Sequence, residues 1–155
     1  MIQRIQSLYL FLITLLTLTF LKWDFLSFSE RTGSVLNVSF YEIMRNNVGQ
    51  APEMIEKLIP LSVLIIIIAA ASLITIFIFK NRKVQLWLSL LLIILSAVFV
   101  IASIHVSFRI ISKFEAKLIP GFKMILPILI LIFSILAYRG IKKDDKLVKS
   151  YDRLR

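Results

Sequence analysis

Long stretches without a charged residue constrain this chain more than any other feature. The clearest stretch lies between Lys57 and Lys80 and holds 22 uncharged residues, including six successive aliphatic residues from Val63 to Ile68. An α-helix rises about 1.5 Å per residue, so about 20 apolar residues cross the roughly 30 Å of bilayer hydrocarbon. The hydrophobic content of 59% and the mean hydropathy of +0.89 agree with a membrane protein.

Four hydrophobic runs predict four transmembrane helices. They lie at about residues 5–22, 58–79, 84–108 and 118–138. The first run is short for a span unless Trp23 and Phe25 extend it, and the fourth needs residues 118–122 to reach spanning length. We therefore predict an all-α membrane protein, a four-transmembrane-helix bundle over residues 1–139 with a basic tail over residues 140–155.

The basic residues predict that both termini are cytoplasmic, an N-in/C-in topology. Basic residues in short loops are retained on the cytoplasmic side, and this topology places 11 of the 19 Lys and Arg there. Three of them, Lys80, Arg82 and Lys83, fall in one four-residue turn. No small-residue cleavage site follows Phe20, which favours a retained anchor over a signal peptide. We expect a multi-pass protein of the bacterial inner (cytoplasmic) membrane.

The outer loop, residues 23–57, is long enough to fold outside the membrane. Partial alternation of apolar and polar residues on both sides of Glu30–Ser34 predicts a β-hairpin. Pro52 and the acids after it favour a helix start before the second span. The loop is either a small outward recognition surface or a connector that caps the helices.

The tail, residues 140–155, predicts a cytoplasmic amphipathic helix. Ile141, Leu147 and Val148 recur at helical spacing, and Lys and Arg surround them. The tail either contacts a partner or anionic lipid, or is only a topology signal. The candidate contact residues are Lys142, Lys143, Lys146, Lys149, Tyr151, Arg153, Leu154 and Arg155. One short helix without a recognised fold is a poor case for nucleic acid, so none is expected.

Small polar residues mark the third hydrophobic run. Ser89, Ser96 and Ser103 are spaced by seven and therefore share one helix face. They either allow close helix packing or line a groove for a lipid or small ligand. In the fourth run, Pro127 predicts a kink.

The chain offers little for catalysis. It has no Cys and a single His, which excludes thiolate sites and imidazole clusters. That residue, His105, has no carboxylate within helical reach, and Ser103 and Ser107 point to other faces. No ionisable residue lies near the middle of a span, where an ion pathway needs one. We predict no catalytic residue, no metal site and no cofactor.

The two ends of the sequence resemble a known family. The opening MIQRIQSLYL (residues 1–10) and the ending RGIKKD (139–144) through DRLR (152–155) are similar to a family of small four-span membrane proteins of Bacteroidota. That family carries only a domain-of-unknown-function label. The resemblance covers the whole chain in length and span order, and implies four helices and an inner-membrane location but no activity.

These observations favour a non-enzymatic accessory or assembly subunit of a larger inner-membrane protein complex. The alternative is a small lipid- or small-molecule-binding carrier with a groove between helices. The expected partners are an integral membrane protein complex and phospholipids, and association between copies of the chain remains open.

Overall fold

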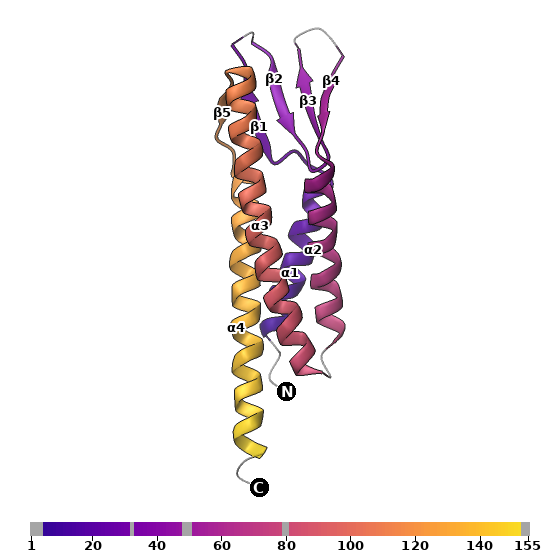
Figure 1. Ribbon diagram of the computed structural model, residues 1–155, viewed down its shortest axis with the longest axis vertical. Coiled ribbons are helices and arrows are strands. Elements are labelled where there is room, and N and C mark those ends of the chain that lie inside the picture. Colours follow the sequence, from indigo (N-terminus) through magenta and orange to yellow (C-terminus); the bar gives the residue numbers. More distant parts are fainter. Residues whose placement is uncertain (1–4, 32, 48–50, 79–80, 153–155) are drawn as a thin grey trace.

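The computed structural model describes residues 5–31, 33–47, 51–78 and 81–152. Four helices run side by side, and an antiparallel sheet stands beyond them at one end (Figure 1). The first turn of α1 and the last turn of α4 both lie toward the opposite end. We call these two ends the sheet end and the terminal end.

The helices are α1 Ile5–Phe20, α2 Ile59–Phe77, α3 Arg82–Phe114 and α4 Leu126–Asp152. α1 and α3 each contact α2 and α4. Leu10, Ile68 and Ile130 are fully buried between them. Gly140 allows α4 to approach α1, because a Cβ there would lie 3.2 Å from the Cβ of Gln6.

In the part of the chain that the structure describes, three helical segments are long and apolar enough to cross a membrane, namely Ile59–Phe77, Arg82–Phe114 and Phe122–Leu147. The last begins in the short 3₁₀ helix η1, Phe122–Ile125, and continues into α4. α1 is apolar but has 16 residues, which gives a length of about 24 Å. Aliphatic side chains such as Ile66, Ile94 and Ile132 cover the outward faces of the three longer segments. The chain is therefore a membrane protein.

The sheet has five strands: β1 Leu26–Ser29, β2 Val35–Val38, β3 Glu42–Asn46, β4 Glu53–Lys57 and β5 Lys117–Ile119. Their order is β4-β3-β2-β1-β5, and each neighbouring pair is antiparallel. The predicted hairpin is confirmed, since β1 pairs with β2 in the register Leu26 to Val38. Gly33 takes a φ of 86° in the turn between them, a conformation that glycine adopts without strain.

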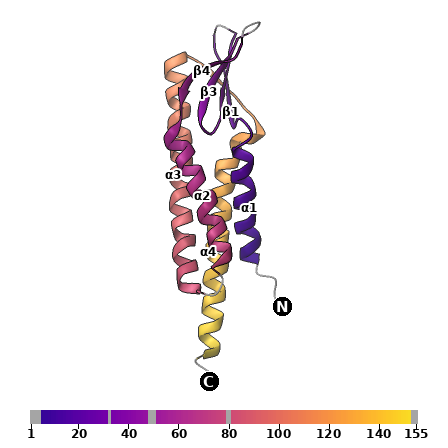
Figure 2. The same cartoon turned by 90° about the vertical axis from the view of Figure 1, so that its right-hand side faces the viewer.

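The length of α3 positions the sheet. Its 33 residues make a helix of about 50 Å, well beyond the roughly 30 Å of hydrocarbon, and its sheet-end turns run beside the strands (Figures 1 and 2). Arg109 Nη2 lies 2.9 Å from Glu56 Oε1, and the Arg45 guanidinium lies 5.3 Å from the centroid of the Phe114 ring. These contacts fix β3 and β4 to α3.

The predicted fold class, an all-α four-transmembrane-helix bundle, is wrong. The five-stranded sheet makes the chain a mixed helix and strand protein, and among the described residues three helical segments rather than four reach spanning length. Charged residues interrupt the apolar alternation in β3 and β4, so these strands carry no clear period-two pattern. β5 overlaps the start of the run 118–138 that hydropathy assigns to the fourth helix.

Three local predictions are also wrong. Residues 53–57 form β4 rather than a helix start, and α2 begins at Ile59 with Pro60 in its first turn. Leu118 lies in β5 and not in the fourth helix. Pro127 lies in the first turn of α4, where its missing N–H has no helical partner to lose, so it causes no kink.

Candidate functional site

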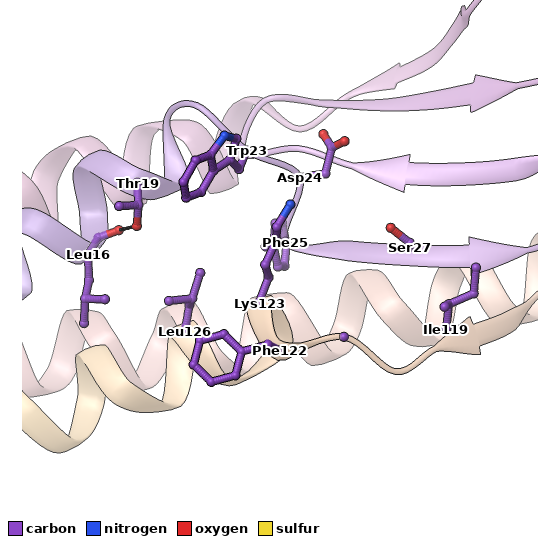
Figure 3. Close-up of a pocket in the computed structure, with 11 residues that line it drawn as sticks. Leu16, Thr19, Trp23, Asp24, Phe25, Ser27, Ile119, Phe122, Lys123 and Leu126 are labelled. Atoms are coloured by element: carbon purple, nitrogen blue, oxygen red, sulfur yellow. Dashed lines mark hydrogen bonds between the residues drawn. The ribbon is translucent and has the colours of Figure 1, made fainter.

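A pocket of about 490 Å³ opens where the sheet-end turn of α1 meets the start of α4 (Figure 3). We call it the seam pocket. It is lined by Leu16, Thr19, Trp23, Asp24, Phe25, Ser27, Ile119, Gly121, Phe122, Lys123 and Leu126. These residues come from α1, the loop after it, β1, β5, the connection from β5 to η1, η1 and α4, so segments about 100 positions apart in the sequence build one site.

The seam pocket is apolar on its helix side and polar toward the sheet. Leu16 and Leu126 form the helix side, and the hydroxyl of Thr19 donates to the carbonyl of Leu16 at 2.6 Å (Figure 3). Toward the sheet, the carboxylate of Asp24 accepts a hydrogen bond from the hydroxyl of Ser39. Lys123 supplies the opposite charge. The pocket thus suits a molecule with an apolar part and a polar part.

Two aromatic side chains at the mouth indicate that the seam pocket lies at a membrane–water boundary. Trp23 is 60% exposed and Phe122 is 77% exposed, and both flank the apolar stretches of their helices. The ammonium of Lys123 lies 5.6 Å from the centroid of the Trp23 ring, a cation–π contact. Trp is enriched at the membrane–water interface, and a Lys side chain near a helix end can extend its ammonium to the same level.

A second aromatic pair lies at the foot of the sheet. The rings of Phe40 and Tyr41 lie 4.8 Å apart. The pKa of Tyr41 is raised, chiefly by a hydrogen bond with the Glu42 carboxylate and then by desolvation and repulsion from that charge. The Tyr41 hydroxyl is thus engaged by the Glu42 carboxylate at the foot of the sheet.

One face of the sheet continues from the seam pocket. Cross-strand pairing places Ile119, Ser27, Asn37, Met44 and Met54 in one row across all five strands. The hydroxyl of Ser27 donates to the side-chain oxygen of Asn37 at 3.0 Å, and Ile119 and Met54 are both more than 40% exposed. We call these five residues the sheet row. Ser27 and Ile119 belong to both surfaces, which makes the pocket and the row continuous.

The three serines of the predicted packing face are buried in α3. Ser89, Ser96 and Ser103 each donate a hydrogen bond to a carbonyl of their own helix, at 2.8, 3.0 and 2.8 Å. Ser103 also borders a small pocket of about 110 Å³ with Pro127 and Ile128. Burial with internal hydrogen bonding favours close helix packing over a hydroxyl-lined groove.

The structure places the predicted tail residues in two groups. α4 continues without interruption through Gly140, so the basic residues extend a long helix rather than a separate one. Lys142 and Lys146 line a pocket against α3, and Lys143 is exposed outside it. Lys149 and Tyr151 lie in α4, but their side chains are outside the described part, as are residues Arg153, Leu154 and Arg155.

His105 is exposed on α3 and does not line the seam pocket. The hydroxyls of Ser103 and Ser107 donate to carbonyls of their own helix, at Phe99 and Ser103. Within residues 5–31, 33–47, 51–78 and 81–152, no group of three or more His, Asp or Glu could hold a metal ion.

Sequence reasoning missed the seam pocket and the sheet row. Trp23 and Lys123 each border a hydrophobic run, and this was the only signal that they share a membrane boundary. Nothing in the sequence showed that residues 117–119 pair with β1, because three residues are too few for a period-two pattern.

Comparison with known proteins gives a family and no activity. No curated protein and no solved structure matches the chain. A family model described as Domain of unknown function (DUF4293) matches residues 2–154. Since this match covers nearly the whole sequence, the chain belongs to the DUF4293 family of unknown function.

Proposed function

We propose that this protein is a non-enzymatic accessory or assembly subunit of a larger protein complex in the bacterial inner membrane. The observation that carries the proposal is the continuous surface formed by the seam pocket and the sheet row. The surface is preorganised, because the pairing of β1 with β5 and the ion pair of Arg109 with Glu56 hold the sheet on the helices. A rigid binding surface loses little conformational entropy when a partner docks.

The distribution of charge supports an orientation with both termini in the cytoplasm and the sheet outside. At the terminal end, three basic residues, Lys80, Arg82 and Lys83, follow within six positions of the last residue of α2. At the terminal end, the exposed lysines of α4 outnumber its acids over residues 139–147. Excess basic charge near the end of a span favours retention on the cytoplasmic side.

The accessory role predicts that a companion protein binds through the sheet row. Met54→Lys places a charge on the row, and we expect it to lower recovery of a stoichiometric companion about tenfold or more. The measurement is affinity purification of an N-terminally tagged full chain from native membranes in mild detergent.

A matched control lies next to Met54 on the same strand. Glu53→Gln changes the net charge by the same one unit, but Glu53 pairs opposite Arg45 and so points to the other face of the sheet. We expect the companion to survive this change. A tagged protein that always purifies alone, or equal losses in both variants, would show that the proposal is wrong.

Binding of a lipid or another small amphipathic molecule is a second candidate function, favoured by the apolar and polar sides of the seam pocket. Thr19→Phe adds a ring to the wall of the pocket, whereas Leu18→Phe adds one to an exposed neighbouring site on α1. Mass spectrometry of the protein purified in mild detergent should show one enriched lipid species that Thr19→Phe reduces about tenfold and Leu18→Phe does not. Equal retention in both variants would exclude this site.

A further inference from the structure

A second pocket lies on the side of the helices near the terminal end. It measures about 420 Å³ and is lined by Leu86, Trp87 and Leu90 of α3 and by Tyr138, Lys142, Asp145 and Lys146 of α4. We call it the lysine pocket. Its α4 residues recur at three and four positions, so one face of α4 turns all four toward α3. It shares no lining residue with the seam pocket.

The lysine pocket combines a cationic rim with an aromatic and aliphatic floor. The ammonium of Lys142 lies 5.6 Å from the centroid of the Tyr138 ring. Lys146 is one helical turn further along the same face, so the two ammonium groups border one opening. Arg82 donates to the backbone carbonyl of Asp144 at 3.3 Å, which ties the start of α3 to α4 beside the pocket. This hydrogen bond therefore helps to hold α3 and α4 together beside Lys142 and Lys146.

The pocket opens onto the surface of α3 that would face lipid. Trp87 is 75% exposed, and Leu90 and Ile94 follow at helical spacing as exposed aliphatic residues. An acyl chain can lie along these residues while its head group stays at the rim. Trp87 and Tyr138 mark the membrane boundary at this end, as Trp23 does at the other.

We propose that the lysine pocket binds an anionic phospholipid, with the phosphate between Lys142 and Lys146 and one acyl chain along Leu90 and Ile94. Lysines in a pocket between membrane helices attract anionic head groups, and their stems also cover apolar surface. With two lysines and one aspartate, the rim has one net positive charge. This net charge matches a singly charged head group such as phosphatidylglycerol.

The test uses tryptophan fluorescence of the full chain in vesicles. The sequence has two tryptophans, Trp23 and Trp87, so Trp23→Phe leaves Trp87 as the single tryptophan that fluoresces. In phosphatidylcholine vesicles, brominated phosphatidylglycerol and brominated phosphatidylcholine are compared at equal mole fraction. We expect brominated phosphatidylglycerol to quench Trp87 with an apparent affinity about tenfold higher than that of brominated phosphatidylcholine.

Two double variants separate the pocket from general charge. Lys142→Gln with Lys146→Gln should reduce the preference to less than about twofold. Lys83→Gln with Lys143→Gln removes the same number of charges from exposed positions outside the pocket, and should keep most of the preference. Equal quenching by both lipids in the Trp23→Phe protein, or equal losses in the two double variants, would overturn the proposal.

Discussion

Replacing Phe28 with alanine should open the sheet while leaving the membrane helices folded. Phe28 lies in β1, has no exposed surface and pairs opposite Leu36 of β2 and Leu118 of β5. It thus sits where the hairpin meets the strand that precedes α4. Truncating a buried phenylalanine in a water-facing core costs about 3 kcal/mol or more. The sheet is small, so this loss is a large part of its stability.

The effect can be measured by hydrogen exchange of the full chain in detergent. A loss of about 3 kcal/mol corresponds to about a hundredfold faster exchange of amides that open with the sheet. We expect this change in β1, β2 and β5 but not in the middle turns of α2 and α3. Ser29→Ala, an exposed change on the next residue of the strand, should leave exchange unaltered. Equal acceleration in the helices would show that sheet and helices unfold as one unit.

Hydropathy identified the strongly apolar elements and misassigned the short polar ones. The run around Val63–Ile68 and the run containing Trp87 correspond to α2 and α3, because lack of charge over 20 residues is a strong physical signal. The hairpin of β1 and β2 was also predictable, since its two strands alternate around a turn. Local pattern was sufficient for these elements.

Long-range pairing determined the elements that sequence reasoning missed. β5 exists because Leu118 and its neighbours pair with β1, nearly 90 positions earlier, although the same residues are apolar enough to extend a span. β4 forms on β3 despite Pro52 and three charged residues, because its partner strand supplies the hydrogen bonds. Such tertiary pairing outweighs local propensity, and a single sequence does not display it.

In the candidate sites, too, some features follow from local sequence pattern and others depend on long-range packing. Lysines 142 and 146 were predictable as contact residues from the charge of the tail, but their assembly with Trp87 into one pocket depends on how α3 and α4 pack. The serine face was predictable from its spacing alone. Whether its hydroxyls face a groove or a packed interface depends on burial, which periodicity does not report.

Ser96 provides the sharpest test of that last question. It is fully buried on α3, and its hydroxyl donates to the carbonyl of Ile93 in the same helix at 3.0 Å. Ser96→Ala should cost less than about 1 kcal/mol, because no partner on another helix loses a hydrogen bond. Ser96→Leu replaces the hydroxyl with three carbon atoms in a filled interface, and we expect a loss of about 2 to 3 kcal/mol.

The measurement is the free energy of unfolding in mixed detergent micelles, with Ile94→Leu as a control at an exposed site two residues away. If the interface is closely packed, Ser96→Leu must lower the free energy of unfolding much more than Ser96→Ala, because only added volume matters there. A hydroxyl-lined groove predicts instead that both variants lose little free energy of unfolding, because leucine would occupy empty space and alanine would remove no contact between helices. The ratio of the two losses therefore separates packing from ligand binding at the serine face, independently of any assay of the protein's activity.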